Sequence, residues 1–271
     1  MHRALYFQLE QEAHVIRSSI GVGLTHLRRA NLHEKGAFYT GFFQLAIGFE
    51  RMAKLGIVLD HLAHNGMAPP GPQMMKNLGH DLVALRQKLE DLAVSRPYQL
   101  DASFTFSAHG QRILDFLSRF AKGMRYGSLD GMASGASVPT PFSEWEPILH
   151  DIISAKIRGA SIQEVAGISS AMREMFEDAT VAISTDLGGR PLDFFSAFST
   201  PPIYDLAAPH VIWEMLLLLA PMRDFVVAAG HAAAELPQAR GPEQVIPFMA
   251  EFFEFIWLER SWQMRRKRWP A

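Results

Sequence analysis

Apolar residues recur at helical spacing along most of the chain, and no stretch alternates apolar and polar residues long enough to predict a sheet. Residues 38–64 give the clearest pattern, with a broad apolar face, and residues 18–23 form a soft point within the first helix. The pattern predicts helices at residues 5–29, 38–64, 72–78, 81–93, 108–124, 144–158, 162–187, 208–235 and 242–268. We therefore predict an all-α fold.

Capping and proline positions predict several helix ends. Residues 143–146 and 161–164 have the Ser-x-x-Glu spacing in which side chain and backbone cap each other at a helix start. Pro209 and Pro242 stand where proline is tolerated at a first helical position. Pro221 lies inside a predicted helix, so we expect it to kink or split that helix.

A segment rich in Gly, Ser, Pro and Ala divides the chain. Residues 127–142 contain a single charge and are predicted to form a loop. The predicted organisation is a helical bundle at residues 1–130, a linker at 131–142, and a C-terminal helical region at 143–271 that packs on the bundle.

Composition removes several kinds of chemistry. The chain has 271 residues, 48% of them apolar, and no cysteine, which excludes a thiol nucleophile and cysteine-ligated metals. Residues 1–14 carry charges where an export signal needs an apolar core, and the longest apolar run, 215–222, is too short to span a membrane. We expect a cytoplasmic protein without a membrane span.

The net charge of −2 conceals an uneven distribution. Residues 1–140 hold 15 Lys and Arg against 11 Asp and Glu, residues 141–264 hold 7 against 17, and residues 265–268 are all basic. This order predicts either electrostatic pairing between copies of the chain or a tail that contacts phosphate.

Motifs for metal, cofactor or triad chemistry are weak. His61 and His64 share a helical face but lack a glutamate between them, and no serine lies in a Gly-x-Ser-x-Gly turn. We expect no metal and no cofactor. Glu50 and Lys54 have the i,i+4 spacing that supports a helix, and they are embedded among apolar residues, so at least one is expected to be partly buried.

Three short motifs follow one another along the chain: Glu50-x-x-x-Lys54, His-Asp-Leu-Val-Ala-Leu at residues 80–85, and Arg125-Tyr126. In this order they resemble motifs on successive helices of HEPN domains (higher eukaryotes and prokaryotes nucleotide-binding). The resemblance covers residues 18–130. It implies a small up-and-down helical bundle that commonly dimerises, in a family tied to RNA cleavage, toxin–antitoxin pairs and bacterial defence.

The resemblance also implies site residues. The interior polar cluster comprises Glu50, Lys54, His80, Asp81 and Arg125, predicted to pin the helix register. Family ribonucleases use Arg, four to six residues, then His on a late helix, which is missing here. Arg28 and His33 have this spacing in the first helical region, so they are the candidate catalytic pair.

The last predicted helix is aromatic and ends in a basic run. Arg265, Arg266, Lys267, Arg268 and Trp269 suit phosphate contact and base stacking on single-stranded nucleic acid. A membrane-surface helix and a buried aromatic face are the alternatives for this helix.

Three functions follow. The first is a non-catalytic HEPN-like protein that binds nucleic acid or a protein partner, in a defence or toxin–antitoxin module. The second is a metal-independent endoribonuclease acting as a dimer through Arg28 and His33. The third is a structural oligomer whose acidic middle meets the basic front of its neighbour.

Overall fold

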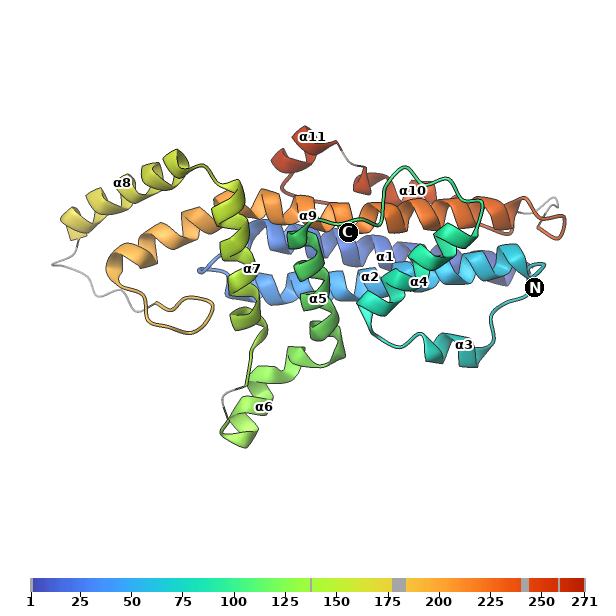
Figure 1. Ribbon diagram of the computed structural model, residues 1–271, viewed down its shortest axis with the longest axis horizontal. Coiled ribbons are helices and arrows are strands. Elements are labelled where there is room, and N and C mark those ends of the chain that lie inside the picture. Colours follow the sequence, from blue (N-terminus) through green and yellow to red (C-terminus); the bar gives the residue numbers. More distant parts are fainter. Residues whose placement is uncertain (1, 137, 177–183, 240–243, 258, 271) are drawn as a thin grey trace.

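The computed structural model describes residues 2–136, 138–176, 184–239, 244–257 and 259–270. In these ranges the elements are helices joined by loops (Figure 1), with one isolated β-bridge between Thr185 and Pro191. The α-helices are α1 (His2–Arg29), α2 (Lys35–His64), α3 (Pro72–Asn77), α4 (Leu82–Ser95), α5 (Ala108–Lys122), α6 (Gly127–Ser134), α7 (Pro141–Lys156), α8 (Gly159–Phe176), α9 (Phe194–Ala234), α10 (Ala250–Phe253) and α11 (Arg260–Arg265). The predicted all-α fold is confirmed.

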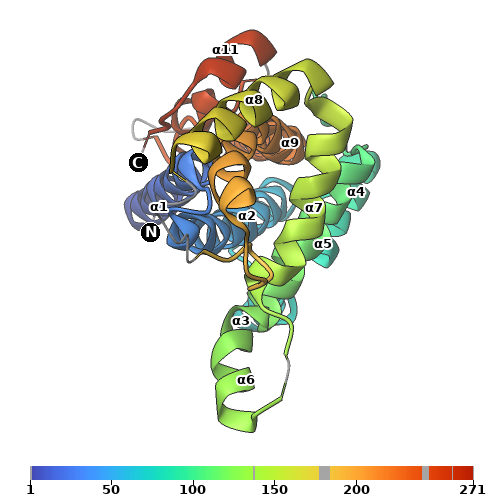
Figure 2. The same ribbon diagram turned by 90° about the vertical axis from the view of Figure 1, so that its left-hand side faces the viewer.

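Three long helices form the centre of the molecule. Helices α1, α2 and α9 lie side by side in both views (Figures 1 and 2) and share one hydrophobic core. A Cβ atom at Gly23 would lie 2.6 Å from Leu45 Cγ, and one at Gly41 would lie 2.6 Å from Leu27 Cγ. The glycines therefore permit α1 and α2 to approach closely, and the soft point expected at residues 18–23 is a continuous part of α1.

Shorter helices cover one side of this centre. Helices α5 and α7 cross the long helices steeply (Figure 1), and α4 lies beside α2. The rings of Phe42, Phe116, Phe120 and Trp145 pack together with centroids 4.7–6.3 Å apart. These buried aromatic residues join α2, α5 and α7 into the common core.

Helix α9 begins earlier than predicted. It starts at Phe194, where Asp193 accepts a hydrogen bond from the backbone N–H of Ser196 at 2.6 Å, rather than at residue 208. Pro209 and Pro221 lie inside the helix. Burial of most of α9 against α1 and α2 offsets the hydrogen bonds that the prolines remove.

The C-terminal segment corrects the prediction of one helix at 242–268. It contains α10, which a short 3-10 helix at Glu254–Ile256 follows directly, and the separate helix α11. Pro247 stands inside the predicted helix, where proline removes a hydrogen bond and clashes with the preceding turn. Pro242 lies outside the described residues.

Two further segments differ from the predictions. Helix α8 ends at Phe176, residues 177–183 lie outside the described residues, and residues 184–192 form a tight loop in place of the helix expected up to residue 187. Helix α6 occupies part of the expected loop at 127–142 and extends away from the body (Figures 1 and 2).

The N-terminal cap of α7 also differs from the prediction. It is Thr140, whose side chain and backbone pair reciprocally with Ser143, so the capping box begins three residues before the predicted one. The domain boundary at 131–142 stays a prediction.

Candidate functional site

Three residues of the predicted polar cluster meet between α2 and the turn before α4. The Glu50 carboxylate accepts a hydrogen bond from Lys54 Nζ at 2.7 Å and lies 3.0 Å from His80 Nδ1. Burial alone would raise the pKa of Glu50, but the hydrogen bonds from Lys54 and His80 outweigh it and hold that pKa below its usual value. The carboxylate is therefore fixed as an anion between two helices.

Asp81 has a different role from the one predicted. Its carboxylate caps α4 by accepting from the backbone N–H groups of Val83 and Ala84, and it also accepts from Lys122 Nζ at 2.8 Å and Ser118 Oγ at 2.9 Å. Lys122 makes the largest contribution to lowering the pKa of Asp81 to about 2. No hydrogen bond or ion pair joins Asp81 to Glu50 in the described part of the chain.

Arg125 lines a small cavity with two of these residues. The cavity has a volume of about 290 Å³, and it is lined by Glu50 of α2, His80 of the turn before α4, and Arg125 of the 3-10 helix Met124–Tyr126 that follows α5. Arg125 Nε is buried and has no hydrogen-bond partner among the residues described. Three of the five predicted residues thus line one cavity, Lys54 contacts Glu50 without lining it, and Asp81 lies apart.

The candidate catalytic pair is not joined by a contact. Among the described residues, no hydrogen bond or ion pair links Arg28 to His33. Burial lowers the pKa of Arg28, and Asp205 of α9 opposes that effect. The Asn31 amide donates to the same Asp205 carboxylate at 3.2 Å. Arg28 therefore lies where the end of α1 packs against α9, while His33 is exposed in the adjoining loop.

Trp269 lies in the core, which corrects its predicted role as a stacking platform. The residue is 5% exposed, its indole N–H donates to Gln263 Oε1 at 3.2 Å, and its backbone N–H donates to Thr25 Oγ1 of α1 at 3.0 Å. Gln263 is itself buried and donates to the carbonyl oxygens of Phe255 and Trp257. Trp269 and Gln263 thus hold the basic run against α1.

The basic run keeps its positive charge. No ion pair within the described ranges involves Arg260, Arg265, Arg266, Lys267 or Arg268. The Arg266 guanidinium lies 4.3 Å from the ring centroid of Trp262, a residue that is 43% exposed. We call Arg260 and residues 265–268 the basic edge.

The basic edge continues onto the neighbouring helices. Burial lowers the pKa of His210 on α9, and the charges of Arg260 and then Lys156 at the end of α7 lower it further. Arg260 and Lys156 therefore lie near one half-buried imidazole, although they are about a hundred residues apart in sequence. Positive charge from α7 and from the C-terminal segment thus lies near His210, where Glu214 of α9 opposes its effect on the pKa.

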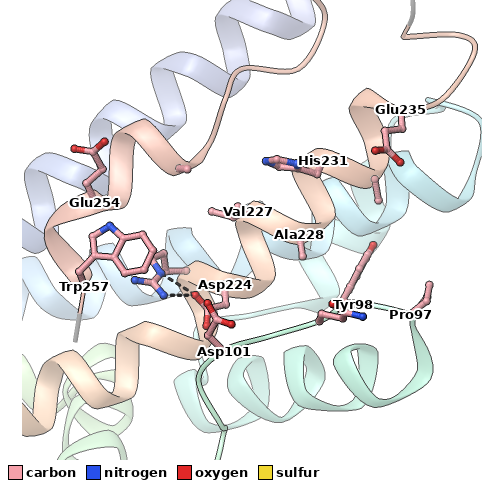
Figure 3. A pocket seen from close by; sticks show the side chains of 14 residues that line it. Pro97, Tyr98, Asp101, Asp224, Val227, Ala228, His231, Glu235, Glu254 and Trp257 are labelled. Carbon is pink, nitrogen blue, oxygen red and sulfur yellow. Dashed lines mark hydrogen bonds and ion pairs between the residues drawn. The ribbon is translucent and has the colours of Figure 1, made fainter. Parts of the chain in front are cut away.

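A second site was not predicted from the sequence. A groove of about 660 Å³ lies between residues 97–101, the C-terminal half of α9, α10 and Trp257 (Figure 3). We call it the α9 groove. Asp101, Glu235 and Glu254 line it, and within the described residues none of these carboxylates forms an ion pair.

One end of the α9 groove rests on a buried ion pair. Arg223 Nε donates to Asp224 at 2.8 Å, and the other Asp224 oxygen accepts from the backbone N–H of Ala102 at 2.8 Å. The Arg223 guanidinium lies over the Trp257 indole, 4.5 Å from the ring centroid. The charge of Arg223 is thereby matched inside the protein.

The opposite wall is fixed by a network around buried Asp60 of α2. Tyr98 Oη donates to Asp60 at 3.0 Å, and Arg96 Nε donates to the same oxygen at 3.1 Å. Burial makes the largest contribution to raising the pKa of Tyr98, and the Asp60 carboxylate raises it further. These contacts hold residues 97–101 at the edge of α9, so the α9 groove has two anchored walls.

Comparison with protein-family models, with curated proteins and with solved structures found no match to this chain. In the described ranges, no group of three or more His, Asp and Glu side chains is placed to hold a metal ion. No helix in those ranges has both the length and the apolar character needed to cross a membrane.

Proposed function

We propose that this protein is a non-catalytic, HEPN-like nucleic-acid-binding protein that contacts phosphates through its basic edge. The observation that carries the proposal is the set of cations at Arg260 and residues 265–268, which have no ion-pair partner among the described residues. Cations without a protein counter-ion are free to displace the counterions of a nucleic-acid backbone, which is the main source of sequence-independent affinity.

Cations elsewhere in the chain provide the contrast. Arg51 pairs with Glu12, Arg96 with Asp60, and Arg119 with Glu144. The basic edge differs because Trp262 lies partly exposed beside it. An aromatic ring next to unpaired arginines suits a single strand, whose bases stack while its phosphates meet the cations.

The geometry of Arg28 and His33 supports the non-catalytic form of the proposal. A metal-independent ribonuclease needs its acid and base within reach of one phosphate, and Arg28 is directed towards the contact with α9. The resemblance to HEPN domains supports a setting in bacterial defence or a toxin–antitoxin module.

Binding is tested with a fluorescent single-stranded RNA of 20 nucleotides, followed by anisotropy between 50 and 200 mM salt. The variant Arg265→Ser/Lys267→Ser/Arg268→Ser is expected to bind more weakly and to lower the slope of log K against log salt by about 2, because each lost phosphate contact removes about 0.7. Gel analysis of the same samples is expected to show intact RNA.

The matched control changes three exposed cations outside the basic edge, Arg3→Ser/Lys76→Ser/Lys88→Ser, with the same change of net charge. We expect it to retain the affinity and the salt slope of the parent protein. An equal loss in both triple variants would contradict a localised site, and cleavage of the RNA that disappears in Arg28→Ala/His33→Ala would overturn the non-catalytic assignment.

A further inference from the structure

We infer that the α9 groove is a binding site for a linear aliphatic oligoamine, a ligand with ammonium groups separated by methylene chains. The inference does not depend on the proposed nucleic-acid binding, because it concerns a separate cavity, although Glu254 and Trp257 also line a neighbouring hollow that contains Arg266. A volume of about 660 Å³ lies within the range of sites for small organic molecules.

The charges of the α9 groove favour a cation. Asp101, Glu235 and Glu254 face it without ion-pair partners in the described part of the chain. Arg223 adds no free positive charge, because Asp224 neutralises it through hydrogen bonds of the guanidinium. The unmatched charge of the site is therefore negative, and a phosphate-bearing ligand would be repelled.

The carboxylates are spread along the groove, and this spacing favours a long ligand over a compact one. Figure 3 shows Glu235 and Glu254 at opposite ends, with Asp101 beside Asp224 between them. Along α9, Asp224 and Glu235 are 11 residues apart, which corresponds to about 16 Å of helix rise. A compact monovalent amine would reach one end only, whereas an extended oligoamine reaches both.

The surface between the ends is mainly apolar, with His231 of α9 and Gln99 as its polar side chains. Val227, Ala228, Ala232 and Ala250 line the middle of the groove. Methylene chains can lie on these side chains without leaving a polar group unpaired. The α9 wall is helical, so its backbone groups are already bonded within the helix, and the backbone of a bound peptide would find few partners there.

Trp257 supplies a contact for a terminal ammonium. The residue is 57% exposed even though Arg223 lies against its ring. An ammonium group near an exposed tryptophan face is attracted by the ring quadrupole, and Glu254 lies three residues before Trp257 on the same end of the groove. Aromatic and acidic groups therefore converge on one end of the ligand.

The test is isothermal titration calorimetry of the full chain without nucleic acid, using spermine, putrescine and a hexalysine peptide as probes. We expect spermine to bind and putrescine to bind at least tenfold more weakly, because the shorter diamine spans less of the groove. The Glu235→Gln/Glu254→Gln variant is expected to lose about tenfold in spermine affinity.

The control variant Glu164→Gln/Glu174→Gln carries the same charge change on exposed positions of α8 and is expected to bind spermine like the parent protein. Trp257→Leu is expected to weaken spermine binding severalfold without changing circular dichroism. Equal effects of both Gln pairs would overturn the inference in favour of diffuse attraction. Binding of hexalysine without binding of spermine would overturn it in favour of a peptide surface.

Discussion

Two tryptophans of the C-terminal segment, Trp257 and Trp262, each lie against an arginine, with similar geometry and different surroundings. In the α9 groove Arg223 lies 4.5 Å from the Trp257 centroid, and in the basic edge Arg266 lies 4.3 Å from that of Trp262. The Arg223 side chain is 7% exposed and is bonded to Asp224. Arg266 has no ion pair among the described residues, and burial lowers its pKa.

The difference shows that the stacking contact does not determine the role of either region. A buried carboxylate next to Arg223 turns the first stack into an electrically neutral wall, beside which free carboxylates make the groove negative. The second stack lacks such a carboxylate, so its charge adds to that of the neighbouring cations. The counter-ion, rather than the aromatic contact, separates a structural arginine from one available to a ligand.

The largest expected effect comes from breaking the neutral stack. Arg223→Met leaves the Asp224 carboxylate buried without its cation, and we expect a loss of about 3–5 kcal/mol in the free energy of unfolding. Urea unfolding followed by circular dichroism at pH 7 measures it. Arg223→Met/Asp224→Leu is expected to lose less than the single variant, because no charge remains unpaired. If Arg223→Met is as stable as the parent protein, the assignment of a structural ion pair is refuted.

An intermediate effect is expected at the residue that links the two stacks. Gln263→Leu leaves the Trp269 indole N–H and the carbonyls of Phe255 and Trp257 without their partner, at a cost of about 1–3 kcal/mol. Hydrogen exchange at the backbone amide of Trp269 is expected to accelerate. Gln111→Leu, at an exposed position on α5, serves as the control and should leave this exchange rate unchanged.

The smallest effect is expected at the charged stack. Arg266→Met removes a cation–π contact at a partly exposed site, so we expect a loss of only about 0.5–1 kcal/mol in unfolding free energy. The same variant should lower the salt slope of RNA binding by about 0.7 if Arg266 contacts a phosphate. A stability loss as large as that of Arg223→Met would erase the distinction between the two stacks.

Local signals in the sequence predicted local structure well. Helix α2 ends at His64, before Asn65 and Gly66, as their turn chemistry predicts, and Gly66 adopts a positive φ of 59°. The prediction of one helix at 242–268 was wrong for two reasons. Pro247 is incompatible with a continuous helix there, and the Gln263 side chain bonds the carbonyl groups of Phe255 and Trp257, which fold back towards it. That second cause is a tertiary contact, which helical periodicity does not report.

The candidate sites show the same difference between local sequence signals and tertiary contacts. Glu50 and Lys54 are one helical turn apart, so their contact follows from spacing, and His80 joins them across a short connection. Asp81 instead caps α4, a role indicated by its position before a helix. The α9 groove could not be predicted, because residues 97–101 and Trp257 meet α9 only through packing. The acidic balance of residues 141–264 was the one sequence signal that pointed towards it.

The hydrogen bond from the Trp269 backbone to Thr25 spans 244 residues, which gives the basic edge a place in the order of folding. A contact of such sequence separation closes a long loop and cannot form before α1 has a surface to receive it. In kinetic terms, the cations of the basic edge belong to a late-forming unit, and local opening of α1 around Thr25 would release them without unfolding the core.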